Sequence, residues 1–344
     1  MKVCFALCVG IYLLHTSLQA QADRECYQKY EKLAQEGDVD AQVALALCLM
    51  DKVQFQQAAQ WLLKASEQGD AEAQYNLGYL YSTGKGVAKN DASAVKYYQK
   101  AAEKGNIKAM NALGFMLLNG IGASKDTAKA ITLLETAAMQ NYADAQKTLA
   151  ESYYTGKGVS QNYEKAFFWY QKLAELGDAQ AQYICGVLHE EGKGTPISIE
   201  KAVQYYQKSM VQKHEPAQLR LGILYLQGKA GTGNKGKGFK ILQELAEKNH
   251  PEACYYVGRC YQNGEGTNKN LEKAALYYQK AADQNHSLAQ MEFGFILLDE
   301  RYKGADKKLA KNYLSKAYSS KELTSEQKSA IQKAWNEHNL KAIQ

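Results

Sequence analysis

Proline is rare in this chain, with three residues in 344, and no long apolar run follows the first 22 residues. Because 46% of the residues are hydrophobic and prolines are so few, little of the chain is expected to be disordered linker. The 42 basic and 36 acidic residues are interspersed, which gives a net charge of +6 and no stripe of positive charge for nucleic acid. These absences predict an ordered protein with no nucleic-acid partner and no stable insertion into a membrane.

The sequence is organised by a period of 36 residues. Residues one period apart form columns, and several columns consist almost entirely of small residues. One column is alanine and another is mostly glycine: Ala73, Ala109, Ala145, Ala181, Ala217, Ala253 and Ala289; then Gly78, Gly114, Ala150, Gly186, Gly222, Gly258 and Gly294. A period in the thirties is typical of a solenoid, which presents a long repeated surface and no single preformed pocket.

Residues 71–106 show what one period contains. Apolar and small residues within 73–81 have helical spacing, a glycine turn follows at 84–86, and a second helical stripe covers 94–102. Two helices joined by a short glycine turn make an antiparallel hairpin. The small columns let the helices approach closely, and glycine or asparagine after the second helix tolerates the left-handed conformation that ends a helix.

The pattern A-x-x-x-L-G-x-x-Y-x-x-G-x-G-V, followed by K-A-x-x-W/Y-Y-x-K-A-A-x-x-G, stands nearly intact at 73–105 and recurs at 145–177 and 253–285. It resembles the Sel-one-like repeat (SLR) family, a relative of the tetratricopeptide repeats. The resemblance implies an all-α fold, a right-handed α/α superhelical solenoid of repeated antiparallel helix hairpins with 36-residue repeats. We expect capping helices at 23–38 and 321–344 and about eight repeats between them: 39–70, 71–106, 107–142, 143–178, 179–214, 215–250, 251–286 and 287–320.

The first 22 residues have the features of a secretion signal. A lysine follows Met1, an apolar run covers 3–14, and Ala20-Gln21-Ala22 matches an A-x-A cleavage site. An uncleaved anchor is the alternative, but a dozen apolar residues fall short of the ~20 needed to span a bilayer. We therefore expect a mature chain that begins at Asp23 and is periplasmic or secreted.

Two cysteines near the mature N-terminus are candidates for a disulfide. Cys26 and Cys48 fall in consecutive predicted helices, and counting outward from the turn at 37–39 places them nearly opposite each other. An oxidising compartment then favours a bridge between them, with two separately buried thiols as the alternative.

The remaining cysteines are not expected to form bridges. Cys254 matches a cysteine position of the cysteine-rich secreted branch of the SLR family, but the partner position there is Ala246, so the resemblance implies no disulfide ladder. Cys185 and Cys260 fall in core columns and are expected to be inert.

Several short segments resemble parts of known catalytic or ligand-binding motifs, but none contains a complete motif. The loop 231–238 nearly matches a phosphate-binding loop, but a glycine stands where the metal-binding hydroxyl belongs and a helix precedes it instead of a strand. His214, His250 and His286 are one repeat apart, too distant to share a metal, and are expected to be solvated turn residues. Ser-x-x-Lys occurs three times without the accompanying motifs of serine β-lactamases: Ser93–Lys96, Ser198–Lys201 and Ser325–Lys328. We expect no enzyme activity, cofactor or metal.

The functional surface is predicted on the first helix of each hairpin. The resemblance to tetratricopeptide repeats implies that these helices line a concave face, where aromatic and polar side chains are typical of binding sites. It selects Tyr75, Tyr79, Phe115, Tyr154, Tyr183, Tyr255 and Arg259. Tyr98, Tyr170, Tyr206 and Tyr278, on the second helices, are predicted to be core.

The predicted function is a non-enzymatic scaffold or adaptor of the cell envelope, or a secreted one, that binds a protein or peptide in this groove. The alternative is a binder or weak hydrolase of β-lactams or peptidoglycan, as in the cysteine-rich branch.

Overall fold

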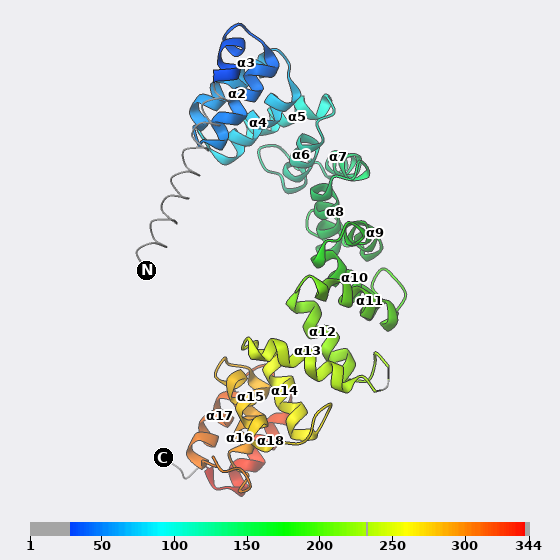
Figure 1. The fold of residues 1–344 in the computed structure, drawn as a ribbon, viewed down its shortest axis with the longest axis vertical. Helices are drawn as coiled ribbons and strands as arrows, with labels where there is room; N and C mark the ends of the chain where they lie inside the picture. The colour runs from blue at the N-terminus through cyan, green and yellow to red at the C-terminus, as the bar shows by residue number, and fades with distance from the viewer. Residues whose placement is uncertain (1–27, 232, 341–344) are drawn as a thin grey trace, which may run out of the picture. The chain divides into compact units, whose positions relative to one another are not determined.

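The computed structural model describes residues 28–231 and 233–340, and every regular element in those ranges is helical (Figure 1). This confirms the all-α prediction. The expected signal at 1–22 and Cys26 lie outside the described residues, so the cleavage and the bridge to Cys48 stay predictions. The chain divides into two compact units, residues 1–169 and 170–344.

The first unit is a row of helix hairpins. A helical stretch at 28–35 precedes α2, and α3, α5 and α7 each pack on the even-numbered helix before them and on the one after them. The helices are α2 (Val39–Asp51), α3 (Phe55–Glu67), α4 (Ala71–Thr83), α5 (Asp91–Glu103), α6 (Ile107–Asn119), α7 (Thr127–Met139) and α8 (Ala143–Thr155), while α9 (Tyr163–Glu175) contains the boundary between the units.

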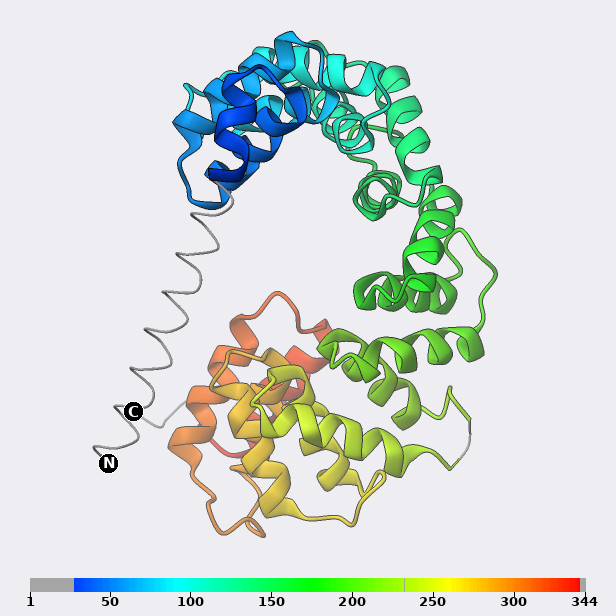
Figure 2. The same cartoon turned by 45° about the horizontal axis from the view of Figure 1, so that its top comes forward.

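The second unit repeats this arrangement, and its pairs can be followed in both views (Figure 1, Figure 2). Its helices are α10 (Ala179–Glu191), α11 (Ile199–Val211), α12 (Glu215–Leu226), α13 (Lys235–Glu247), α14 (Pro251–Asn263), α15 (Leu271–Ala282), α16 (Ser287–Ile296), α17 (Lys307–Ser319) and α18 (Ser325–Glu337). Thr324 and Gln327 form the capping box expected at the start of the last helix.

The glycine column has a packing reason that the structure makes specific. In the six hairpins that have a glycine in this column, a tyrosine or leucine side chain of the second helix packs against the glycine of the first. A Cβ atom at Gly186 would stand 2.5 Å from Cε1 of Tyr206, and one at Gly222 would stand 2.6 Å from Cγ of Leu242. Real carbon contacts need about 3.5–4.0 Å, so only glycine fits while that side chain stays in place.

The tyrosines assigned to the core are buried, which confirms that prediction. Tyr98 and Tyr170 are each 4% exposed, and Tyr206 and Tyr278 are 0% exposed. Their hydroxyls still find partners, because Tyr206 donates to Glu190 at 2.7 Å and Tyr278 donates to Gln262 at 2.6 Å. A buried tyrosine hydroxyl with a partner avoids the penalty of an unsatisfied polar group.

The turns after the second helices also follow the prediction, with one exception. The expected glycines and asparagines, including Gly177, Asn249 and Asn285, all have positive φ. Lys213 occupies the same column and also has a positive φ of 61°. A lysine there is strained, because its Cβ crowds the backbone in the left-handed region.

Three cysteines of the second unit are buried free thiols. Burial raises the pKa of Cys185 and of Cys260 to about 12, which agrees with inert core residues. The sulfur of Cys254 lies 3.5 Å from the carbonyl oxygen of Ala246, the residue at which the cysteine-rich branch has its second cysteine. The Cys254 thiol therefore makes a weak S–H hydrogen bond to the backbone of Ala246 and forms no disulfide.

Candidate functional site

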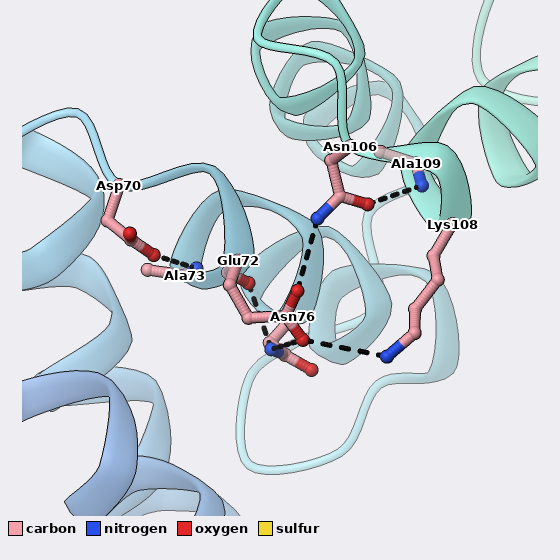
Figure 3. A network of polar contacts seen from close by, with 7 residues as sticks. All are labelled: Asp70, Glu72, Ala73, Asn76, Asn106, Lys108 and Ala109. Atoms are coloured by element: carbon pink, nitrogen blue, oxygen red, sulfur yellow. Dashed lines mark hydrogen bonds and ion pairs between the residues drawn. The ribbon is translucent and has the colours of Figure 1, made fainter. Parts of the chain in front are cut away.

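Neighbouring hairpins are joined on the first-helix side by the residues that cap the first helices. Asn106 accepts a hydrogen bond from the Ala109 amide at 2.9 Å and donates to Glu72 of the preceding hairpin at 3.1 Å. Glu72 also accepts from Asn76 at 3.3 Å and lies 3.7 Å from the Lys108 ammonium (Figure 3). One side chain therefore caps the N-terminus of its own helix and also fixes that helix against the preceding hairpin.

In the second unit histidines occupy this capping position. His286 accepts from the Ala289 amide at 3.2 Å through Nδ1, and its Nε2 lies 2.9 Å from Glu252. Its ring stacks on Tyr255, with 4.8 Å between centroids. The expectation that His214, His250 and His286 are solvated turn residues is wrong, because all three are half-buried helix caps.

Three of the predicted groove tyrosines share one packing arrangement. Tyr75, Tyr183 and Tyr255 are half-buried, and each ring lies 5.8–5.9 Å from the core tyrosine of the same hairpin. Burial raises the pKa of Tyr75, and it raises that of Tyr255 to about 12. These side chains are therefore part of the packing of the fold, and the rings of Tyr183 and Tyr255 also contact His214 and His286 of the next hairpin.

Tyr79, Tyr154 and Arg259 are also half-buried and are held by neighbours. The Lys85 ammonium donates to the Tyr79 hydroxyl at 2.9 Å, and Tyr154 meets Tyr163 edge to face at 5.6 Å. The Arg259 guanidinium lies over Tyr256 at 4.9 Å and pairs with Glu265 at 3.6 Å. Such contacts fix the direction of each of these side chains.

Phe115 differs from the other predicted residues, because 47% of its surface is exposed. It lies beside a cavity of about 230 Å³ between α6 and α8, the first helices of neighbouring hairpins. The cavity is lined by Phe115, Leu118, Asn119, Thr148, Glu151, Ser152, Thr155 and Lys157. Phe115 and Glu151 occupy the same column of the repeat, so this cavity is where the structure brings two positions of the predicted face together.

One recurring contact was not predicted from the sequence. A glutamine after the column alanine donates to the carbonyl eight residues earlier, at the end of the preceding second helix. Gln146 reaches Ala138 at 3.0 Å, and Gln182 reaches Ala174 at 3.2 Å. The sequence does contain a pattern that could have predicted this contact, because these glutamines recur with the same 36-residue period as the small residues.

No helix in the described ranges combines the length and the apolar content needed to span a bilayer. Within the same ranges, no group of three histidine, cysteine or acidic side chains is placed to bind a metal ion.

Comparison with known proteins agrees with the repeated hairpins. The family model described as Sel1 repeat matches residues 39–70, 71–106, 107–142, 143–178, 179–209, 215–250, 251–286 and 287–321. A protective antigen of uropathogenic Escherichia coli strains, which displays an SLR fold, is 29% identical with a TM-score of 0.75, over 84% of this chain and 62% of that one. The chain thus spans less than two thirds of that antigen's length.

A Sel1 repeat protein from Oxalobacter formigenes has the same fold, with 24% identity and a TM-score of 0.65, over 89% of this chain and 90% of that one. No curated protein sequence matches the chain.

Proposed function

The chain belongs to the Sel1 repeat family, and we propose that it is a non-enzymatic scaffold that binds a protein or peptide on its first-helix face. Sel1 and related repeat proteins generally act as interaction scaffolds, which supports the class of function. The role we infer is in the cell envelope or outside the cell, after removal of residues 1–22.

The cavity beside Phe115 is the observation that carries this proposal. A phenylalanine with 47% of its surface in water gains free energy when a partner covers it, at roughly 25 cal/mol per Å² of apolar area. The cavity it flanks holds about 230 Å³, and one of about 150 Å³ is enough for benzene in other proteins. One apolar side chain of a peptide fits that space.

The rim of the cavity suits the backbone and charges of a peptide. Asn119 and Thr155 use their own donors within their helices, bonding to the carbonyls of Phe115 and Glu151 at 2.8 Å. The Asn119 amide oxygen, the Glu151 carboxylate and the Lys157 ammonium then offer both acceptors and a donor around an apolar floor. An apolar centre with a polar rim is the usual anatomy of a binding hot spot.

Photo-crosslinking tests the proposed face directly. Benzoylphenylalanine replaces Phe115 in one variant and Phe168 in another. Phe168 is a matched control, because it is 44% exposed but lies on the second helix α9. We expect a defined crosslinked partner from position 115 and none from position 168, and Phe115→Ala should weaken capture of that partner where Phe168→Ala does not. Equal crosslinking from both positions would show that the first-helix face has no special role.

The proposed compartment has its own test. Mass spectrometry of the protein recovered outside the cytoplasm should give a chain that begins at Asp23. A chain that retains Met1 in the envelope fraction would instead support an anchor.

A further inference from the structure

In the second unit, positive charges are concentrated on the second helices of the hairpins and negative charges on the first helices, although the two signs are interspersed along the sequence. The second helices of its hairpins (α11, α13, α15 and α17) carry eleven lysines against four glutamates. The first helices (α10, α12, α14 and α16) carry five glutamates against two arginines. The positive excess is greatest on α17, which has four lysines and no carboxylate.

The first turn of α17 has lysines where related helices have glutamate. Lys308 occupies the column of Glu200 in α11 and Glu272 in α15, and Lys307 precedes it. The amide end of a helix is electropositive, so a cation there is unfavourable by about 0.3–1 kcal/mol. Asp306, the adjacent carboxylate, is engaged in capping the Leu309 amide at 2.9 Å.

Neither of these two lysines contributes an ion pair to the described part of the fold. Lys307 and Lys308 are exposed, and no carboxylate in that part of the chain lies within ion-pair distance of either ammonium. On the neighbouring helix α18, Glu337 pairs with Lys333 at 3.7 Å. The electrostatic potential at the exposed surface around the start of α17 is therefore positive.

An apolar pocket lies next to these lysines, between α17 and α18. It has a volume of about 250 Å³ and is lined by Lys311, Ser315, Trp335 and Leu340. Lys311 is one helical turn after Lys307, so the two ammonium groups are on the same side of α17. The Trp335 ring is held by Tyr318, with 5.0 Å between centroids.

We propose that α17 and this pocket, the α17 surface, bind an acidic peptide segment of a partner protein. One apolar side chain of the segment enters the pocket against Trp335 and Leu340. Carboxylates on either side of it pair with Lys307 and Lys308. This surface is on a second helix and the C-terminal cap, so it is a separate site from the first-helix face.

Two features favour a peptide over a lipid surface. Leu276 is the last large apolar residue along the described part of the chain whose side chain is exposed, and it lies on α15. No large apolar side chain of α17 or α18 is therefore placed to enter a bilayer. The apolar surface near α17 is recessed instead, and a recess receives a side chain. Its volume exceeds the ~150 Å³ that holds benzene in other proteins, which suits leucine or phenylalanine.

Three labelled peptides test the proposal with the full chain: acetyl-EELEE, acetyl-EEAEE and acetyl-QQLQQ. Fluorescence anisotropy is measured at about 20 mM and about 150 mM salt, because exposed charge pairs are screened as salt rises. We expect EELEE to bind about tenfold more tightly than either other peptide at low salt, since each loses one of the two contributions. Binding of EELEE should weaken at the higher salt.

Variants separate the α17 surface from general attraction to a basic protein. The double change Lys307→Gln and Lys308→Gln should weaken EELEE binding about tenfold, whereas Lys273→Gln on α15 should not. Ser315→Leu fills the pocket and should abolish the preference for EELEE over EEAEE. Phe115→Ala should leave EELEE binding unchanged, which keeps this result independent of the first-helix proposal. Melting curves confirm that each exposed-site variant is folded.

Several results would overturn the proposal. QQLQQ binding as tightly as EELEE would show that charge plays no part, and unchanged binding by the double lysine variant would place the site elsewhere. Cosedimentation with phosphatidylglycerol vesicles that is lost in the same variant, without binding of any peptide, would assign the α17 surface to lipid.

Discussion

Replacing Gly186 by alanine tests the central packing rule of the hairpins with a single methyl group. The new Cβ would stand 2.5 Å, 2.7 Å and 3.1 Å from three ring atoms of Tyr206. Tyr206 is 0% exposed, and its hydroxyl is held by Glu190 at 2.7 Å, so the ring has no free direction in which to move. Either α10 and α11 must separate, or the hydrogen bond must break.

The expected loss follows from three contributions. Overpacking a well-filled core costs about 1–3 kcal/mol. Loss of a hydrogen bond to a charged group costs about 1.5–3 kcal/mol. The higher helix propensity of alanine offsets about 1 kcal/mol of this loss, because glycine is a poor helix former. If the ring is displaced and its hydrogen bond is lost, the net destabilisation of Gly186→Ala should be roughly 1.5–5 kcal/mol.

The decisive measurement repeats the substitution after Tyr206→Ala. Without the ring only the helix preference remains, so Gly186→Ala should then stabilise the protein by up to ~1 kcal/mol. Urea unfolding gives the overall change, and hydrogen exchange of α10 and α11 locates it, since repeat arrays need not unfold in two states. The reasoning fails if the substitution has the same sign in both backgrounds, or if Gly186→Ala alone is as stable as the parent.

Three further predictions follow from local geometry. Lys213→Asn should raise the melting temperature, because asparagine tolerates the left-handed conformation that costs other residues about 1–2 kcal/mol; an unchanged midpoint contradicts the strain. Cys185 and Cys260, whose pKa values burial raises to about 12, should not react with a thiol reagent at pH 8 until urea unfolds the chain. Desolvation lowers the pKa of His189 and of His214, so the folded state binds fewer protons, and stability should fall as the pH drops below about 6.5. Changing both histidines to glutamine should flatten that pH dependence in thermal scans, and an equally steep profile would exclude them as its cause.

The fold was predictable because the period appears in residues whose size is constrained. Gly186 must be small because Tyr206 covers it, and Asn249 must tolerate a positive φ because the chain reverses there. Each constraint acts within one hairpin and repeats with it, so one repeat predicts the next. Lys213 shows the limit, because a strained residue can occupy a column when the surrounding helices fix the turn.

The candidate site was predicted less completely, because position on a helix does not give exposure. Tyr75 and Phe115 are both predicted face residues. Tyr75 packs on Tyr98, whereas Phe115 remains 47% exposed beside a cavity. Whether a ring packs or projects depends on what the neighbouring hairpin places beside it, and the column pattern holds no such information.

The histidines show that chemically different residues can have the same structural role at one position of the repeat. Asn106 and His286 are chemically different, yet each accepts from its own helix and contacts a glutamate of the preceding hairpin. A neutral histidine with its proton on Nε2 has the same donor and acceptor pattern as the asparagine amide. The sequence therefore presents three isolated histidines, whereas the fold uses His286 to cap its own helix and to hold it to the preceding hairpin. His250 caps only its own helix, and His214 contacts Gln180 of the preceding hairpin without a side-chain cap bond. Because His286 also stacks on Tyr255, the capping network and the proposed binding face meet at one side chain. A change at this cap should therefore also change the proposed binding face.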